Sequence, residues 1–89
     1  MQALGFIETR SLTASIEASD VMTKTADVWV VETEKIGSGL VNVVIQGDID
    51  AVTAAVKAGE AVAKEIGEVY AVNVIPRPHD DIAKILPSI

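Results

Sequence analysis

The chain has 89 residues, enough for one domain, and 49% of them are hydrophobic although only one Phe, one Trp and one Tyr are present. Seven Lys and Arg against thirteen Asp and Glu give a net charge of −6, which makes nucleic acid and anionic lipid poor partners. The absence of cysteine excludes disulfides and cysteine-ligated metal sites.

The opening residues MQALGFIETR lack the basic leader of a signal peptide, and no apolar run approaches the roughly 20 residues of a membrane span. We therefore expect a cytoplasmic protein. So small a chain with so many aliphatic residues is also expected to pack against copies of itself.

The first predicted elements are a strand and an amphipathic helix. Residues 3–9 form a short apolar segment typical of a strand, and Ser11 offers a hydroxyl where a helix can begin. Between residues 12 and 24 the polar side chains fall on one narrow stripe, which consists of Thr13, Glu17, Asp20 and Lys24. We expect the remaining wide side to be buried, with Leu12, Ala14, Ile16, Ala18, Val21 and Met22 in the interior.

A hairpin follows, because residues 26–33 and 40–46 are rich in Val and Ile and enclose a Gly-Ser-Gly turn. Gly37 and Gly39 can take the positive φ that such a turn needs. Both segments are so continuously apolar that we expect both of their faces to be covered.

The strongest periodic pattern lies in residues 49–66, which we predict to be a helix with Asp48 as its N-cap. Gly59 inside this helix indicates close packing against the sheet or a neighbour, and Gly67 ends the helix as a C-terminal glycine. Residues 69–75 form a last strand, and Pro76 stops it because proline cannot donate to a ladder.

This order of elements, β-α-β-β-α-β with a central hairpin, predicts an α+β fold of the ferredoxin-like type. A short C-terminal helix is expected over residues 79–86, before Pro87. We expect residues 1–89 to form a single domain without internal repeats.

No residue pattern supports catalysis. His79, the single histidine, stands beside Asp80 and Asp81, but one ring and two adjacent carboxylates lack metal-ligand spacing, so a surface histidine is the favoured interpretation. The serines have no second histidine or elbow motif to activate them. The lysine before the Gly-Ser-Gly turn does not make a phosphate loop, since the order of residues is wrong. We expect no enzyme activity, no cofactor and no metal.

Five motifs in one register resemble the hexamer-forming shell proteins of bacterial microcompartments. They are ALGFIETR at the start, IEASDVMTKTA in the first helix, EKIGSGL at the hairpin, GDIDAV at the second helix and VIPRPH after the last strand. The resemblance covers nearly the whole chain and is strongest to the propanediol- and ethanolamine-utilisation shell proteins. It implies a ferredoxin-like variant that assembles as a flat cyclic hexamer.

The resemblance also implies which residues act. The hairpin residues Lys35, Ile36, Gly37, Ser38 and Gly39 would line a narrow pore on the six-fold axis and let small polar metabolites cross. Contacts between hexamers would involve Lys24, Asp27, Arg77 and His79. The implied partners are identical hexamers, paralogous shell proteins and targeting peptides of enclosed enzymes, in a microcompartment shell within the bacterial cytoplasm.

The alternative from another class is a small ferredoxin-like oligomer that binds a metabolite between subunits as a regulator. Such a regulator needs a long ligand-binding loop, and the predicted connections are too short for one. Shell building block and regulator differ in assembly, since the first predicts six-fold discs and the second a trimer.

Overall fold

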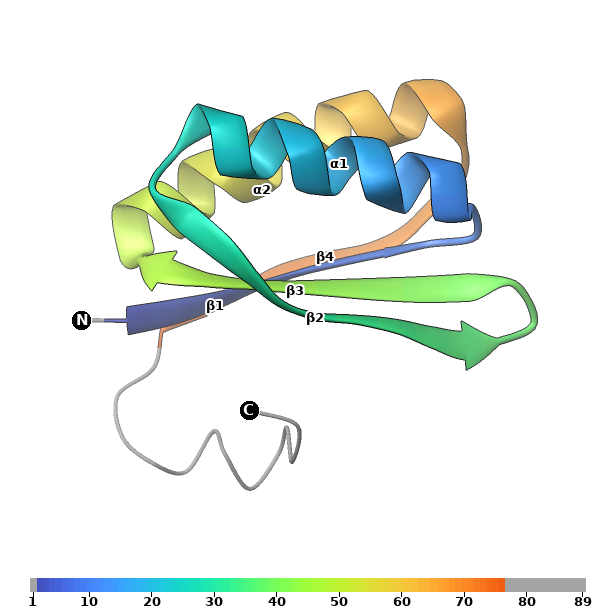
Figure 1. The fold of residues 1–89 in the computed structure, drawn as a ribbon, viewed down its shortest axis with the longest axis horizontal. Helices are drawn as coiled ribbons and strands as arrows, with labels where there is room; N and C mark the ends of the chain where they lie inside the picture. The colour runs from blue at the N-terminus through green and yellow to red at the C-terminus, as the bar shows by residue number, and fades with distance from the viewer. Residues whose placement is uncertain (1, 77–89) are drawn as a thin grey trace.

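The computed structural model describes residues 2–76, which form two helices and four strands (Figure 1). In chain order the elements are β1 (Gln2–Thr9), α1 (Leu12–Thr25), β2 (Val28–Gly37), β3 (Leu40–Asp48), α2 (Ile49–Ile66) and β4 (Val69–Pro76). The predicted order β-α-β-β-α-β is therefore confirmed. The predicted C-terminal helix over residues 79–86 lies outside the described residues.

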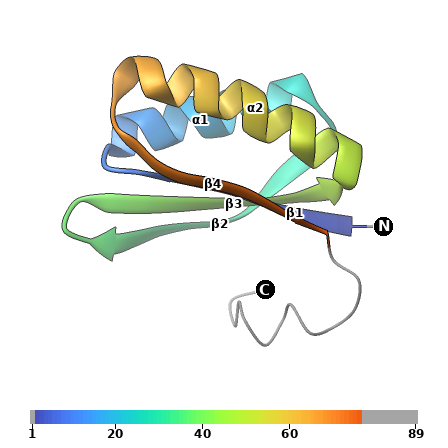
Figure 2. The same ribbon diagram turned by 180° about the vertical axis from the view of Figure 1, so that it is seen from behind.

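The four strands form one sheet in the order β2-β3-β1-β4, with every neighbouring pair antiparallel. Both helices cover the same face of this sheet, as Figures 1 and 2 show from opposite sides. The helix α2 packs chiefly on β1 and β4, and α1 packs beside it. This order of strands with both helices on one face is the ferredoxin-like arrangement.

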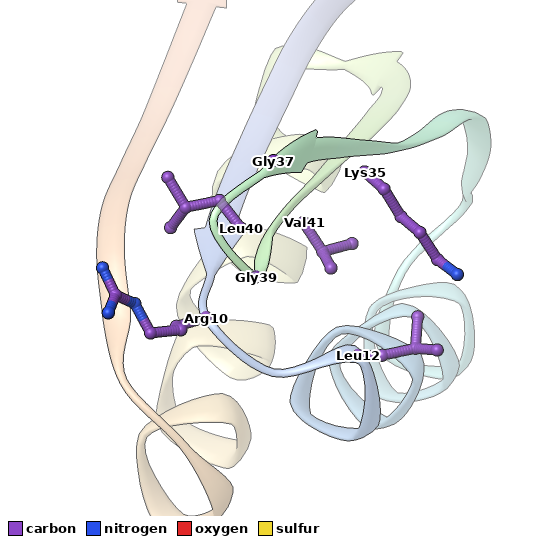
Figure 3. Close-up of a pocket in the computed structure, with 7 residues that line it drawn as sticks. All are labelled: Arg10, Leu12, Lys35, Gly37, Gly39, Leu40 and Val41. Carbon is purple, nitrogen blue, oxygen red and sulfur yellow. The ribbon is translucent and has the colours of Figure 1, made fainter.

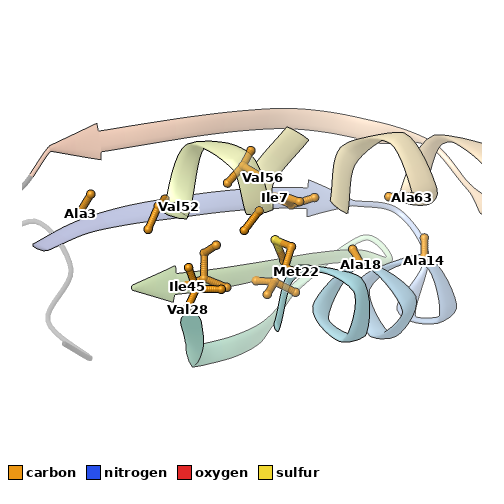
Figure 4. Packing of buried hydrophobic residues seen from close by; sticks show 12 residues of the cluster. Ala3, Ile7, Ala14, Ala18, Met22, Val28, Ile45, Val52, Val56 and Ala63 are labelled. Atoms are coloured by element: carbon orange, nitrogen blue, oxygen red, sulfur yellow. The ribbon is translucent and has the colours of Figure 1, made fainter. Parts of the chain in front are cut away.

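The main core lies between the sheet and the two helices (Figure 4). Small residues of α1 and α2 face each other there, and Gly59 allows the closest approach. A Cβ on Gly59 would lie 2.7 Å from Cγ of Met22 and 2.9 Å from Cδ1 of Ile7. The prediction that this glycine permits close packing is confirmed, and its neighbours are α1 and the central strand β1.

The helices begin and end close to where the sequence predicted, but the contacts made by the residues at their ends differ in part from the prediction. Ser11 caps α1 as predicted, because its Oγ accepts a hydrogen bond from the N–H of Ala14 at 3.1 Å. Asp48 precedes α2 as predicted, but its side chain makes no capping hydrogen bond. Gly67 ends α2 in an extended conformation, where a Cβ would lie 2.8 Å from Cβ of Ser11. Close approach of the two helix ends therefore requires this glycine.

The expected burial is wrong in two places. On α1, Leu12 and Ile16 are exposed, with relative accessibilities of 43% and 57%, whereas Ser15 is buried against Thr9. On the hairpin, β3 is largely buried but most of β2 is exposed, including Trp29. The described chain therefore carries apolar side chains that it does not bury itself.

Candidate functional site

The hairpin between β2 and β3 closes through only two residues, Ser38 and Gly39. Three successive residues have positive φ: Gly37 at 114°, Ser38 at 55° and Gly39 at 79°. Positive φ at both loop residues is the signature of a type I′ turn, which suits the twist of the flanking strands. The sequence predicted the two glycines correctly but gave no indication that Ser38 is also in the left-handed region, where a Cβ is unfavourable.

The strand pairing carries an irregularity just before the turn. Lys35 pairs with Val41 and Gly37 pairs with Leu40, so Ile36 is an extra residue in β2. Its side chain is half exposed, at 50%. The five residues from 35 to 39 are all exposed and lie together at the tip of the hairpin. We call this tip, together with the neighbouring start of α1, the turn end of the molecule.

A hollow of about 360 Å³ lies beside this turn (Figure 3). Its lining consists of Arg10, Leu12, Lys35, Gly37, Gly39, Leu40 and Val41. In Figure 3 the side chains of Arg10 and Lys35 point away from each other on opposite sides of the hairpin. The two cations therefore do not converge on one anion, and the hollow is essentially apolar.

The helix α1 separates the turn end from the predicted contact residues between hexamers. It begins beside the hairpin turn and runs toward the opposite end of the sheet (Figure 1). Lys24 lies in its last turn, about 18 Å from Leu12 at 1.5 Å per residue. Asp27 is exposed in the connection that follows, at the same end of the molecule. We call this region the far end.

Lys24 makes an ion pair within its own helix. Its Nζ lies 3.0 Å from Oδ2 of Asp20, one helical turn earlier. Both side chains are more than half exposed, at 74% and 52%. Water screens such a pair and weakens it, and the high exposure of Lys24 leaves its ammonium group accessible to another molecule. Arg77 and His79, the other two predicted contact residues, lie outside the described residues.

The serine hydroxyls near the start of α1 have structural roles. Ser11 caps the helix, Ser15 shares a hydrogen bond of 2.9 Å with Thr9 Oγ1, and Ser19 donates to the carbonyl of Ser15. Within residues 2–76 no group of three or more His, Asp or Glu side chains is placed to hold a metal ion. No helix in that range is long and apolar enough to cross a membrane.

Sequence reasoning missed the apolar surface and one aromatic contact. The large exposed apolar side chains are Leu12, Ile16, Trp29, Val30, Ile36, Ile66 and Tyr70. The high aliphatic content was the available signal, but it could not place these residues. Arg10 lies over the Tyr70 ring, with its guanidinium carbon 4.9 Å from the ring centroid, and no local pattern marks two residues 60 positions apart in the sequence.

The described residues thus form a ferredoxin-like sheet with a short exposed Gly-Ser-Gly hairpin at one end and with apolar side chains left uncovered on α1, β2 and β4. The family model described as the BMC domain matches residues 3–78, and the chain belongs to this family.

Curated relatives match at nearly full length. The chain is 60% identical to the bacterial microcompartment shell protein PduA of Citrobacter freundii, over 98% of this chain and 94% of that protein. It is 52% identical to the bacterial microcompartment shell protein EutM of Escherichia coli K12, over 98% of this chain and 90% of that one. These relatives support a structural shell role.

A solved structure agrees with the fold. The crystal structure of a microcompartment protein from Desulfitobacterium hafniense superposes with a TM-score of 0.82 at 33% sequence identity. The match covers 92% of this chain but 44% of the other, so this chain spans less than half of that protein's length.

Proposed function

We propose that this chain is a building block of a bacterial microcompartment shell in the cytoplasm, with residues 1–89 as one shell domain. Six copies close into a flat ring in which the turn ends point toward the axis. Rings then join edge to edge through their far ends. The chain acts by assembly and passage of metabolites, not by catalysis, and needs no cofactor or metal.

The observation that carries this proposal is that the hairpin residues and Lys24, which we predict to act in two different contacts, lie at opposite ends of the folded molecule. The residues from Lys35 to Gly39 lie at the turn end, and Lys24 lies at the far end. A ring with the turns at its axis therefore directs Lys24 outward, where it meets the next ring. One chain could not serve both contacts if these residues lay side by side.

The exposed apolar side chains support closure of the ring. They lie on α1 and β2 along one flank and on β4 and the end of α2 along the other, and β2 and β4 are the two outer strands of the sheet. Contact between different flanks of adjacent copies is heterologous, and such contacts form closed rings when the rotation between copies permits it. Burial of Leu12 and Ile16 against the next copy would stabilise the ring by the hydrophobic effect.

The turn suits a narrow polar opening. Six copies of Ser38 would present hydroxyl groups and backbone N–H groups around one axis, and the flanking glycines keep bulk away from it. Such donors replace part of the hydration shell of a hydroxylated or anionic metabolite, whereas an apolar molecule gains little from them. Small polar metabolites would therefore cross preferentially.

The proposed partners rest on the ring edge and on the family resemblance. They are further copies of the ring, paralogous shell proteins and targeting peptides of enclosed enzymes. The edge contact includes Lys24 and Asp27, and on the family resemblance also Arg77 and His79.

The regulator hypothesis finds no support in the described part of the chain. Four connections between its elements are two residues long, and β3 passes directly into α2. A ligand-binding loop of the length that such regulators use is therefore missing from residues 2–76.

Native mass spectrometry at micromolar concentration tests the proposal. We expect a six-membered assembly. A trimer would favour the regulator, and a monomer would refute the shell role in this form.

A further inference from the structure

The hairpin turn extends past the strand that supports the rest of the hairpin. The last pair between β1 and β3 joins Thr9 to Val41, so Leu40 and the turn have no β1 residue beside them. On one side the turn is open, since nothing lies within 4 Å of the position that a Cβ on Gly37 would occupy. The turn therefore depends on few contacts for its position.

Arg10 supplies a contact at this point. A Cβ on Gly39 would lie 3.6 Å from Cγ of Arg10 and 4.0 Å from its carbonyl oxygen. The aliphatic part of the arginine side chain therefore lies directly against the turn. Figure 3 shows this side chain passing beside Gly39 toward β4.

Arg10 is itself held by Glu68, the residue before β4, and by Tyr70 near the start of that strand. Its backbone N–H donates to the carbonyl oxygen of Glu68 at 3.0 Å, and its guanidinium carbon lies 4.9 Å from the centroid of the Tyr70 ring. The strand pairing explains why Tyr70 can reach it. Glu8 pairs with Ala71 and Thr9 pairs with Val69, so Tyr70 is an extra residue in β4. A bulge of this kind changes the direction of a side chain, and here the ring meets the guanidinium group.

We propose that Arg10 is a positioning residue for the hairpin turn, fixed by Tyr70 on one side and supporting Gly39 on the other. The contact links the outer strand β4 to the turn, across the end of β1. Loss of the Arg10 guanidinium group or of the Tyr70 ring leaves the turn in a wider range of positions. The consequence for passage through a pore rests on the function proposed above, because the turn must then lie at the ring axis.

Amide hydrogen exchange measured by mass spectrometry tests this, with residues 34–42 as the hairpin segment and residues 43–48 as the reference. Arg10→Met keeps an aliphatic side chain but removes the charge, and Tyr70→Leu removes the ring. Each variant should raise the exchange rate of the hairpin segment about two- to five-fold, the range expected from an exposed cation–π contact. Exchange in the reference segment should stay unchanged.

Two further variants separate this role from a general loss of stability. Tyr70→Phe keeps the ring and should exchange like the wild type. The double variant Arg10→Met, Tyr70→Leu should exchange no faster than either single variant, because both substitutions remove the same contact. Native mass spectrometry of each sample ensures that proteins of equal assembly state are compared.

Unchanged hairpin exchange in both single variants would overturn the proposal, and so would additive effects in the double variant. The result is independent of the shell role. Exchange reports on the turn in any assembly, whereas the number of copies in the wild-type protein decides whether a ring forms.

Discussion

Lys24→Ala should abolish contact between rings while the ring itself persists. The structure indicates a small cost to the chain. Lys24 is 74% exposed, and its pair with Asp20 joins two exposed side chains one helical turn apart. Such pairs contribute about 0.3–0.5 kcal/mol, so the free energy of unfolding should fall by no more than about 0.5 kcal/mol.

The expected effect on assembly is much larger. A hydrogen bond from a charged group contributes roughly 1.5–3 kcal/mol, which corresponds to about a ten-fold or greater change in the equilibrium constant of each contact. Every ring presents six copies of Lys24 in the proposed assembly, so the losses accumulate over all its neighbours. Electron microscopy should show sheets or tubes for the wild type and dispersed rings for Lys24→Ala.

Lys64→Ala is a matched control. Lys64 is 61% exposed, and its Nζ lies 3.1 Å from Oε2 of Glu60, with the same spacing on α2. This variant removes the same charge and a pair of the same spacing, although Glu60 is less exposed than Asp20, at 28% against 52%, and it should still form sheets. Sheets of normal extent in Lys24→Ala would refute the role of Lys24. Equal loss of sheets in both variants would show that net charge, not the edge contact, controls assembly.

Substitutions at three other positions test the turn, the core and a helix cap. Ser38→Leu should leave the ring intact by native mass spectrometry but slow the flux of polar substrate into shells, because six apolar side chains constrict and dewet the opening. Ser38→Gly should widen the opening instead. A flux into Ser38→Leu shells equal to that of the wild type would mean that Ser38 is only a turn residue. Gly59→Ala should lower the free energy of unfolding by about 1 kcal/mol in denaturant titration, since overpacking against Met22 outweighs the gain in helix propensity, and an increase would contradict the packing argument. Ser11→Ala should cost about 1 kcal/mol in the same assay through loss of the cap to Ala14, and no change would show that the cap contributes little.

The order of elements followed from the sequence because its signals are local. Ser11 caps α1, and Gly37 and Gly39 have the positive φ that their lack of a Cβ allows. The hydrophobic period of residues 49–66 predicted α2 with its observed bounds. Such features depend on residues only a few positions apart, so the chain specifies them without reference to the rest of the fold. The five motifs added the family, which the comparison then confirmed for residues 3–78.

The sequence correctly placed Ala14, Ala18 and Met22 of α1 in the core, but only the tertiary structure decided where the edge of that buried side lies. The sequence offered a wide apolar side, but Ser15 is buried with Thr9 while Leu12 and Ile16 face outward. The choice depends on where α2 and the sheet lie, and a helix pattern does not contain their positions. The same holds for the extra residues Ile36 and Tyr70, since a bulge exists only relative to a paired strand. The sequence by itself therefore determined the elements, the turn and the family, whereas packing between distant segments decided the exposed apolar surface and the contact of Arg10 with Tyr70.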